Sequence, residues 1–174
     1  MTKRFAIFLT AAVLAALVVL PATASAAITL TPKEKRVVAL VNKIRTDRGL
    51  AKLTVKPCLV RAARNHATEM GAQQYFGHDS YSGESFARRL IRHGYKREGF
   101  SLWKVGEDIA YGSGLYSTPE LIVDNWMHSK AHRAVILTKA FRNIGIGVKQ
   151  CAEGYGGCGD PVSFFTLDLG RRIQ

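Results

Sequence analysis

The sequence predicts an α+β fold in which four helices precede two antiparallel strands. The first observation is that apolar residues recur at helical spacing in four segments between Pro32 and Trp126. The second is that apolar and polar residues alternate with period two at 143–148, as in a half-buried strand, and that a second strand is expected at 163–169. There is no internal repeat and no low-complexity tract. One layered domain accounts for this pattern.

Residues 1–26 have the three parts of a cleavable secretory signal. Lys3 and Arg4 give a short positive start, and residues 5–20 form an apolar run without a charge. The small residues Ala-Ser-Ala at 24–26 match the usual cleavage site. We therefore predict that the protein is exported and that the signal is removed.

A transmembrane anchor is the alternative for the same apolar run. The run is shorter than the roughly 20 residues that a spanning helix needs, and Pro21 follows it. We therefore expect no transmembrane anchor, and a secreted location that is extracellular or in the cell wall. Residues 27–174 remain as one domain, large enough for a core that needs neither metal nor disulfide.

The chain is basic, with a formal net charge of +12 that is only slightly reduced when Lys3 and Arg4 are removed. Positive charge of this kind either keeps a domain soluble or attracts it to an anionic partner. No nucleic-acid motif accompanies the charge, and export argues against nucleic acid as a partner. An anionic cell-wall polymer or lipid is therefore the expected class of partner.

Three cysteines are present, and export places them in an oxidising compartment. Cys151 and Cys158 flank the glycine-rich loop 152–157 that joins the two strands as a hairpin, so a local disulfide is predicted there. Cys58 is then expected to be a buried free thiol in a helix. Pairing of Cys58 with either of the other two cysteines stays open.

The first helix has the strongest local signals. Thr31 and Glu34 form a capping box around Pro32, and Gly49 closes the helix. The other helices are expected at about 58–74, at about 84–93 before Gly94, and from Ser117 or Thr118 onward, with the choice of N-cap open.

Two groups of polar side chains on these helices have simple structural interpretations. His66 shares a face of the second helix with apolar residues, which is typical of a hydrogen-bonded core histidine. Arg88, Arg89 and Arg92 are expected to form a solvated face of the third helix. Contact of these arginines with an anionic polymer is the alternative.

Four polar residues outside these patterns are candidates for function: His78, Glu107, Ser129 and His132. They lie far apart in the sequence, and their spacing alone does not show that they meet. Around them lie Tyr75-Phe76-Gly77-His78, Gly106-Glu107-Asp108-Ile109-Ala110, Trp126-Met127-His128-Ser129, His132-Arg133 and Ile144-Gly145-Ile146-Gly147-Val148. This succession of motifs resembles the CAP superfamily of cysteine-rich secretory, antigen 5 and pathogenesis-related 1 proteins, in particular its secreted bacterial branch.

The resemblance implies an α-β-α sandwich with a central, mostly antiparallel sheet. It also implies a cleft with two histidines and two acids, of which His78, His132 and Glu107 match. Ser129 stands where the second acid would fall. With this composition His78 and His132 are the candidate ligands of zinc or another divalent metal, beside Glu107.

Other interpretations of these residues remain open. A histidine beside a carboxylate can be a metal-free hydrogen-bonded pair that fixes two loops to the sheet. His128 and His132 could bind metal if they shared one helix, although Ser129 stands where a zinc protease needs Glu, and the resemblance places a helix break between them. Asp108 departs from the Asn usual in relatives.

The resemblance implies no single reaction. Our first hypothesis is a secreted CAP-domain binding module that acts at or near the cell envelope, with a metal or small polar ligand at His78, Glu107, Ser129 and His132. The alternative is a secreted metal-assisted hydrolase, with His78, Glu107 and His132 as catalytic candidates. A purely structural envelope or spore component is the third class.

Overall fold

The computed structural model describes residues 28–157 and 159–174. The predicted signal at 1–26 and Cys158 lie outside the described residues. In chain order the elements are α1 (Pro32–Thr46), β1 (Thr54–Val55), α2 (Pro57–Gln73), α3 (Phe86–Arg92), β2 (Leu102–Ser113), the 3₁₀ turn η1 (Gly114–Ser117), α4 (Pro119–His128), α5 (Lys130–Ile136), β3 (Asn143–Cys151) and β4 (Val162–Ile173).

The four strands form one mixed sheet in the order β1-β3-β4-β2. β4 pairs antiparallel with both β3 and β2, and the short β1 pairs parallel with β3. β2 is therefore an edge strand, although it is as long as the central β4. This position leaves one side of β2 open to the segments that carry the candidate residues.

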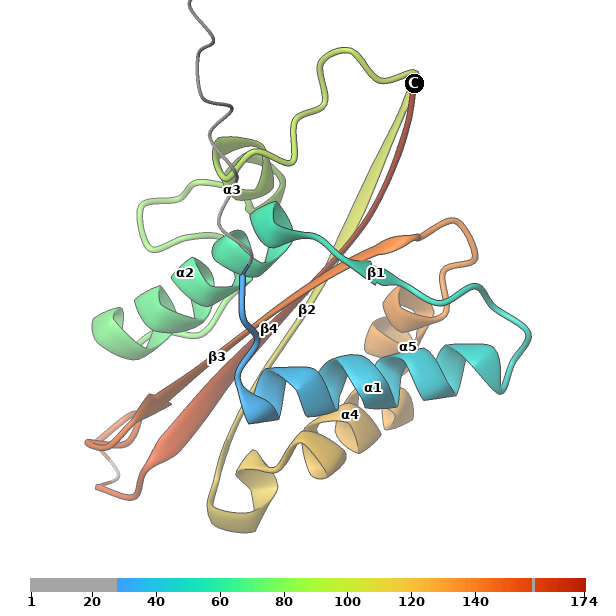
Figure 1. Ribbon diagram of the computed structural model, residues 1–174. Coiled ribbons are helices and arrows are strands. Elements are labelled where there is room, and N and C mark those ends of the chain that lie inside the picture. Colours follow the sequence, from blue (N-terminus) through green and yellow to red (C-terminus); the bar gives the residue numbers. More distant parts are fainter. Residues whose placement is uncertain (1–27, 158) are drawn as a thin grey trace, which may run out of the picture.

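Helices cover both faces of this sheet, as Figure 1 shows. α1, α4 and α5 pack on one face around a cluster that includes Val41, Trp126 and Leu167. α2 and α3 lie on the other face, where Leu59 and Met70 of α2 pack in clusters that include Tyr95 and Phe164. The predicted α+β class and α-β-α sandwich are confirmed. No helix in residues 28–157 and 159–174 is long and apolar enough to cross a membrane.

The predicted helix starts are confirmed by their hydrogen bonds. Thr31 Oγ1 accepts from the amide of Glu34 at 3.3 Å, and the Glu34 carboxylate accepts from the amide of Thr31 at 2.8 Å. At α4 the structure decides between the two candidate caps, because Thr118 Oγ1 accepts from the amide of Leu121 at 3.5 Å. Local sequence signals therefore set where these helices begin.

The cysteines are arranged only partly as expected. Cys58 lies in α2 with a free thiol, but it is half-buried rather than buried. Cys151, at the end of β3, is also a free thiol within the described residues, so these two are not joined to each other. The Cys151–Cys158 disulfide stays a prediction, because Cys158 lies outside the described part of the chain.

Two glycines of β3 allow α2 to pack directly on the sheet. A Cβ at Gly147 would overlap the backbone of Ala63, and one at Gly145 would overlap the backbone of Leu59. We expect Gly147→Ala to lower the free energy of unfolding by about 1–3 kcal/mol, because the strand and helix must move apart. Urea denaturation measures this cost, with Gly77→Ala as the control because open space surrounds Gly77. Equal stability of the two variants would contradict this packing.

Candidate functional site

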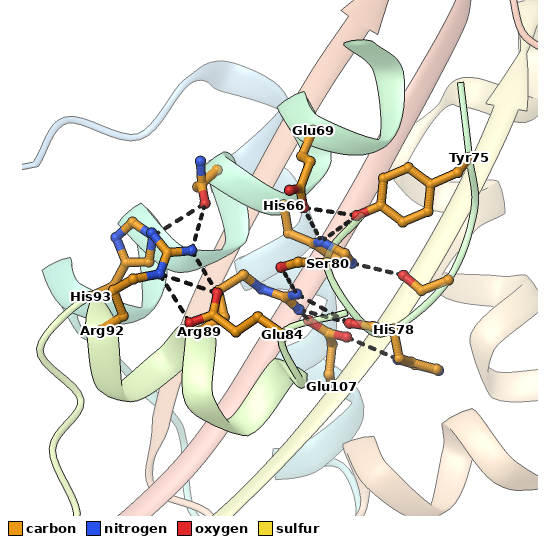
Figure 2. A network of polar contacts seen from close by, with 12 residues as sticks. His66, Glu69, Tyr75, His78, Ser80, Glu84, Arg89, Arg92, His93 and Glu107 are labelled. Carbon is orange, nitrogen blue, oxygen red and sulfur yellow. Dashed lines mark hydrogen bonds and ion pairs between the residues drawn. The ribbon is translucent and has the colours of Figure 1, made fainter. Parts of the chain in front are cut away.

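His78 and Glu107 are in direct contact although they come from different elements of the chain. His78 lies in the loop between α2 and α3, and Glu107 lies on β2. His78 Nδ1 is 2.9 Å from Glu107 Oε1; the histidine side chain is half-exposed and the glutamate side chain is buried (Figure 2). A carboxylate accepts hydrogen bonds, so Nδ1 carries the proton and donates it. In the neutral ring the lone pair is then on Nε2.

Arg89 occupies the other side of Glu107. Its guanidinium pairs with Glu107 Oε2, donates to the backbone carbonyl of His78 at 3.1 Å and donates to Ser80 Oγ at 3.1 Å. The prediction that Arg89 lies on a solvated face is wrong, because its side chain is fully buried. The signal was present in the sequence: Arg89 lies three residues after Phe86 and beside Leu90, on the apolar face of α3.

The loop that carries His78 is also held from α2. His66 Nε2 is 2.8 Å from the backbone carbonyl of Gly77 and therefore donates to it. His66 is completely buried, and burial lowers its pKa, which keeps the ring neutral. The predicted core histidine is confirmed, and its hydrogen bond positions the residue directly before His78.

His132 approaches the site from the opposite face of the sheet. It lies half-buried on α5, and His78 is the charged group that contributes to lowering its pKa. Ser129 is the junction residue between α4 and α5, half-buried, and its side chain caps no amide of α5. The helix break expected after His128 is thus confirmed. His128 and His132 lie on different helices, and His128 is exposed beside Asp124.

The two histidines of the site have opposite pKa shifts. The hydrogen bond from His78 to Glu107 raises the pKa of His78, which favours its protonated form. Burial lowers the pKa of His132, and the nearby His78 lowers it further. One imidazole is therefore a stronger base than usual and the other a weaker one.

Two further carboxyl groups lie directly under this site. Asp168 on β4 is the register partner of Glu107, and Asp108 is the next residue along β2. Neighbouring residues of a strand point to opposite faces, so Asp168 and Glu107 share the α2 face while Asp108 points toward the α4 side. Both aspartates are fully buried, and their carboxyl oxygens have no hydrogen-bond partner in the described part of the chain.

Burial is the main cause of the unusual titration of these aspartates. It raises the pKa of Asp108 to about 8 and, together with the neighbouring Glu107, raises that of Asp168 well above its usual range. Asp108 is therefore mostly a neutral acid near pH 7, and the shift of Asp168 likewise favours its neutral form. Asp168 was not predicted as part of the site, since an aspartate in a strand of apolar residues shows its partner only when the strand register is known.

The donor atoms at this site determine what it can hold. Both oxygens of Glu107 are engaged, one by His78 and one by Arg89. Among residues 28–157 and 159–174, no group of three or more His, Cys, Asp or Glu is placed to hold a metal ion. A divalent metal at this site would have to be held by two imidazoles, His78 through Nε2 and His132, with Glu107 orienting the first from outside the coordination sphere.

A separate surface pocket lies at the far end of α2. It measures about 740 Å³ and is lined by residues of the α2 C-terminus and the β3–β4 hairpin, among them Gln74 and Cys151. None of the four candidate residues lines it. The His78–His132 site is therefore distinct from this pocket.

Comparison with known proteins places these features in a family. The sequence model of the cysteine-rich secretory protein family, CAP, matches residues 38–169. The chain belongs to the CAP family. The Bacillus subtilis (strain 168) protein YkwD is 36% identical over 126 residues, which cover 72% of this chain and 46% of YkwD. The membrane protein YlbC of the same organism is 33% identical over 121 residues, covering 69% of this chain and 32% of YlbC.

Solved CAP-type structures show the same architecture. An extracellular protein containing an SCP domain from Bacillus anthracis str. Ames has a TM-score of 0.62 and 26% identity over 83% of this chain and 45% of its own. An outer surface protein from Borrelia burgdorferi has a TM-score of 0.63 at 18% identity, covering 83% of this chain and 96% of its own, and supports the fold alone. The chain spans less than half of either curated relative, so their whole-protein activities do not carry over.

Proposed function

We propose that this CAP domain is exported and acts as a binding module at or near the cell envelope, with its ligand held between His78 and His132. Membership of the CAP family and the extracellular SCP-domain protein of Bacillus anthracis support export. The predicted signal at 1–26 and the net charge of +12 point the same way.

The observation that carries the proposal is the state of Glu107. A general base needs a carboxylate that is free to take a proton, whereas Glu107 is buried and engaged on both oxygens by His78 and Arg89. Glu107 therefore orients His78 rather than reacting. What remains available is a pair of imidazoles, which suits a divalent metal such as zinc or a small polar ligand.

Zinc binding to the purified mature domain tests this proposal. We expect isothermal titration with zinc alone to show one site that His78→Ala or His132→Ala abolishes. Glu107→Gln should weaken it by about 10–100-fold through loss of orientation of His78. His93→Ala is the matched control, since His93 lies at the end of α3 beside Asn65.

Three other results of these binding experiments would contradict the proposed site or function. Loss of zinc binding in His128→Ala but not in His78→Ala would indicate that zinc is bound by His128 on α4 and His132 on α5. If no histidine variant changes the binding of zinc or of labelled wall polymer and lipid, the site proposal fails and a structural envelope or spore role is favoured. Release of a product from labelled wall polymer, lipid or peptide that stops in His78→Ala would favour the metal-assisted hydrolase instead.

A further inference from the structure

The paired ends of β2 and β4 form a tip that extends beyond both helical layers, as Figure 1 shows near the C-terminus. Leu102 and Ile173 are register partners at this tip, and they remain 38% and 42% exposed. We call the two residues and the cations around them the strand tip. About two fifths of each aliphatic residue is therefore exposed to solvent at the tip.

Five cations lie in the segments that form this tip. They come from both strands and from the loop that precedes β2: Lys96, Arg97, Lys104, Arg171 and Arg172. Lys104 and Arg171 are direct register partners, and like charges at opposed positions destabilise a sheet. Within residues 28–157 and 159–174 none of the five cations forms an ion pair, and the acid of the adjoining loop, Glu98, is exposed.

One of these cations is held in place by aromatic rings. The Arg172 guanidinium lies 4.3 Å from the ring centroid of Tyr95 and 4.6 Å from that of Phe100. Trp103 is fixed beside it, since its Nε1 donates to the backbone carbonyl of Tyr95 at 3.0 Å. Because side chains alternate along a strand, Leu102, Ile173, Lys104 and Arg171 share one face of the strand tip, and Arg172 with its aromatic partners lies on the other.

We propose that the strand tip docks the domain on an anionic lipid surface. Leu102 and Ile173 enter the boundary between headgroups and acyl chains, and the surrounding cations contact the lipid phosphates. A soluble polyanion would engage the same cations but would leave both aliphatic side chains in water. The apolar pair therefore favours lipid over polymer, and this docking is independent of what the His78–His132 site binds.

Co-sedimentation with vesicles tests the proposal. Wild-type protein should bind vesicles that contain phosphatidylglycerol and not vesicles of phosphatidylcholine alone. Because each surface cation contributes about 1 kcal/mol, Lys104→Gln with Arg171→Gln should weaken binding about 30-fold. Leu102→Ser with Ile173→Ser should weaken it about tenfold or more. These positions are exposed or half-buried, so equal thermal midpoints for all variants check that folding is unaffected.

The control lies at the other end of β2. Leu115 and Tyr116 are 78% and 69% exposed in η1, so Leu115→Ser with Tyr116→Ser removes more exposed apolar surface without touching the strand tip. This variant should bind vesicles like the wild type. The proposal is overturned if the control loses binding while the strand-tip variants keep it. It is also overturned if Leu102→Ser with Ile173→Ser changes nothing while soluble polyphosphate competes fully, which would identify a polyanion as the partner.

Discussion

Replacing Arg89 with methionine is expected to lower the free energy of unfolding by about 3–5 kcal/mol, although the new side chain fits an apolar surrounding. The variant leaves Glu107 buried without its cation, and breaking one partner of a buried ion pair has a cost of this size. It also frees the backbone carbonyl of His78 and the hydroxyl of Ser80. Urea denaturation at pH 7 measures the effect.

The adjacent residue provides a matched control. Arg88 is exposed, so Arg88→Met should change stability by less than about 0.5 kcal/mol. The double variant Arg89→Met with Glu107→Gln should recover part of the loss, because the uncompensated charge is then gone. If Arg88→Met and Arg89→Met cost the same, or if the double variant is worse than the sum of its parts, the ion pair is not what holds this site together.

Asp108→Asn is expected to stabilise the protein, and increasingly so with rising pH. The variant removes a carboxyl that has no hydrogen-bond partner in the described part of the chain and whose pKa burial raises to about 8. Since each pKa unit corresponds to about 1.4 kcal/mol, the difference between 3.8 and about 8 predicts a gain on the order of 5 kcal/mol at pH 8. At pH 4 the two proteins should be nearly equal.

The direction of this pH dependence follows from which state, folded or unfolded, keeps the proton on Asp108. The folded state keeps Asp108 protonated up to a pKa of about 8, whereas the unfolded chain loses this proton near the ordinary value of 3.8. The stability of the wild type therefore falls as pH rises between these two values, and Asp108→Asn removes that part of the fall. Asp160→Asn, at an exposed position, serves as the control. Parallel stability curves for wild type and Asp108→Asn would contradict a neutral, buried Asp108.

The sequence predicted the parts of the fold that have local signals. The capping box at Thr31 placed α1, alternation at 143–148 placed β3, and the strand predicted at 163–169 corresponds to β4. β2 was not recognised as a strand from its own pattern, because Glu107 and Asp108 interrupt its apolar residues. Glu107 is tolerated there because the fold supplies Arg89, and Asp108 because burial raises its pKa and favours the neutral acid. No local pattern reports either condition.

The candidate site was predicted to a similar extent. His78, Glu107 and His132 came from family motifs, and the structure brings His78 against Glu107. His132 lies on α5, where His78 contributes to lowering its pKa. Arg89 was predicted to be exposed to solvent because its charge was given more weight than its position on the apolar face of α3. Asp168 could not be assigned, because its nearness to Glu107 depends on the pairing of β2 with β4.

The sharpest test of the proposed ligand site follows the histidine ring nitrogens by ¹H–¹⁵N NMR in metal-free domain as zinc is added. Before zinc, His78 should carry its proton on Nδ1 and titrate above the ordinary pKa of 6.5, and Glu107→Gln should lower that pKa. With zinc, the ¹⁵N resonances of His78 Nε2 and of one ring nitrogen of His132 should shift together, while those of His93 should not. If zinc shifts neither His78 nor His132, or shifts His128 and His93 in their place, the proposed ligand site is wrong.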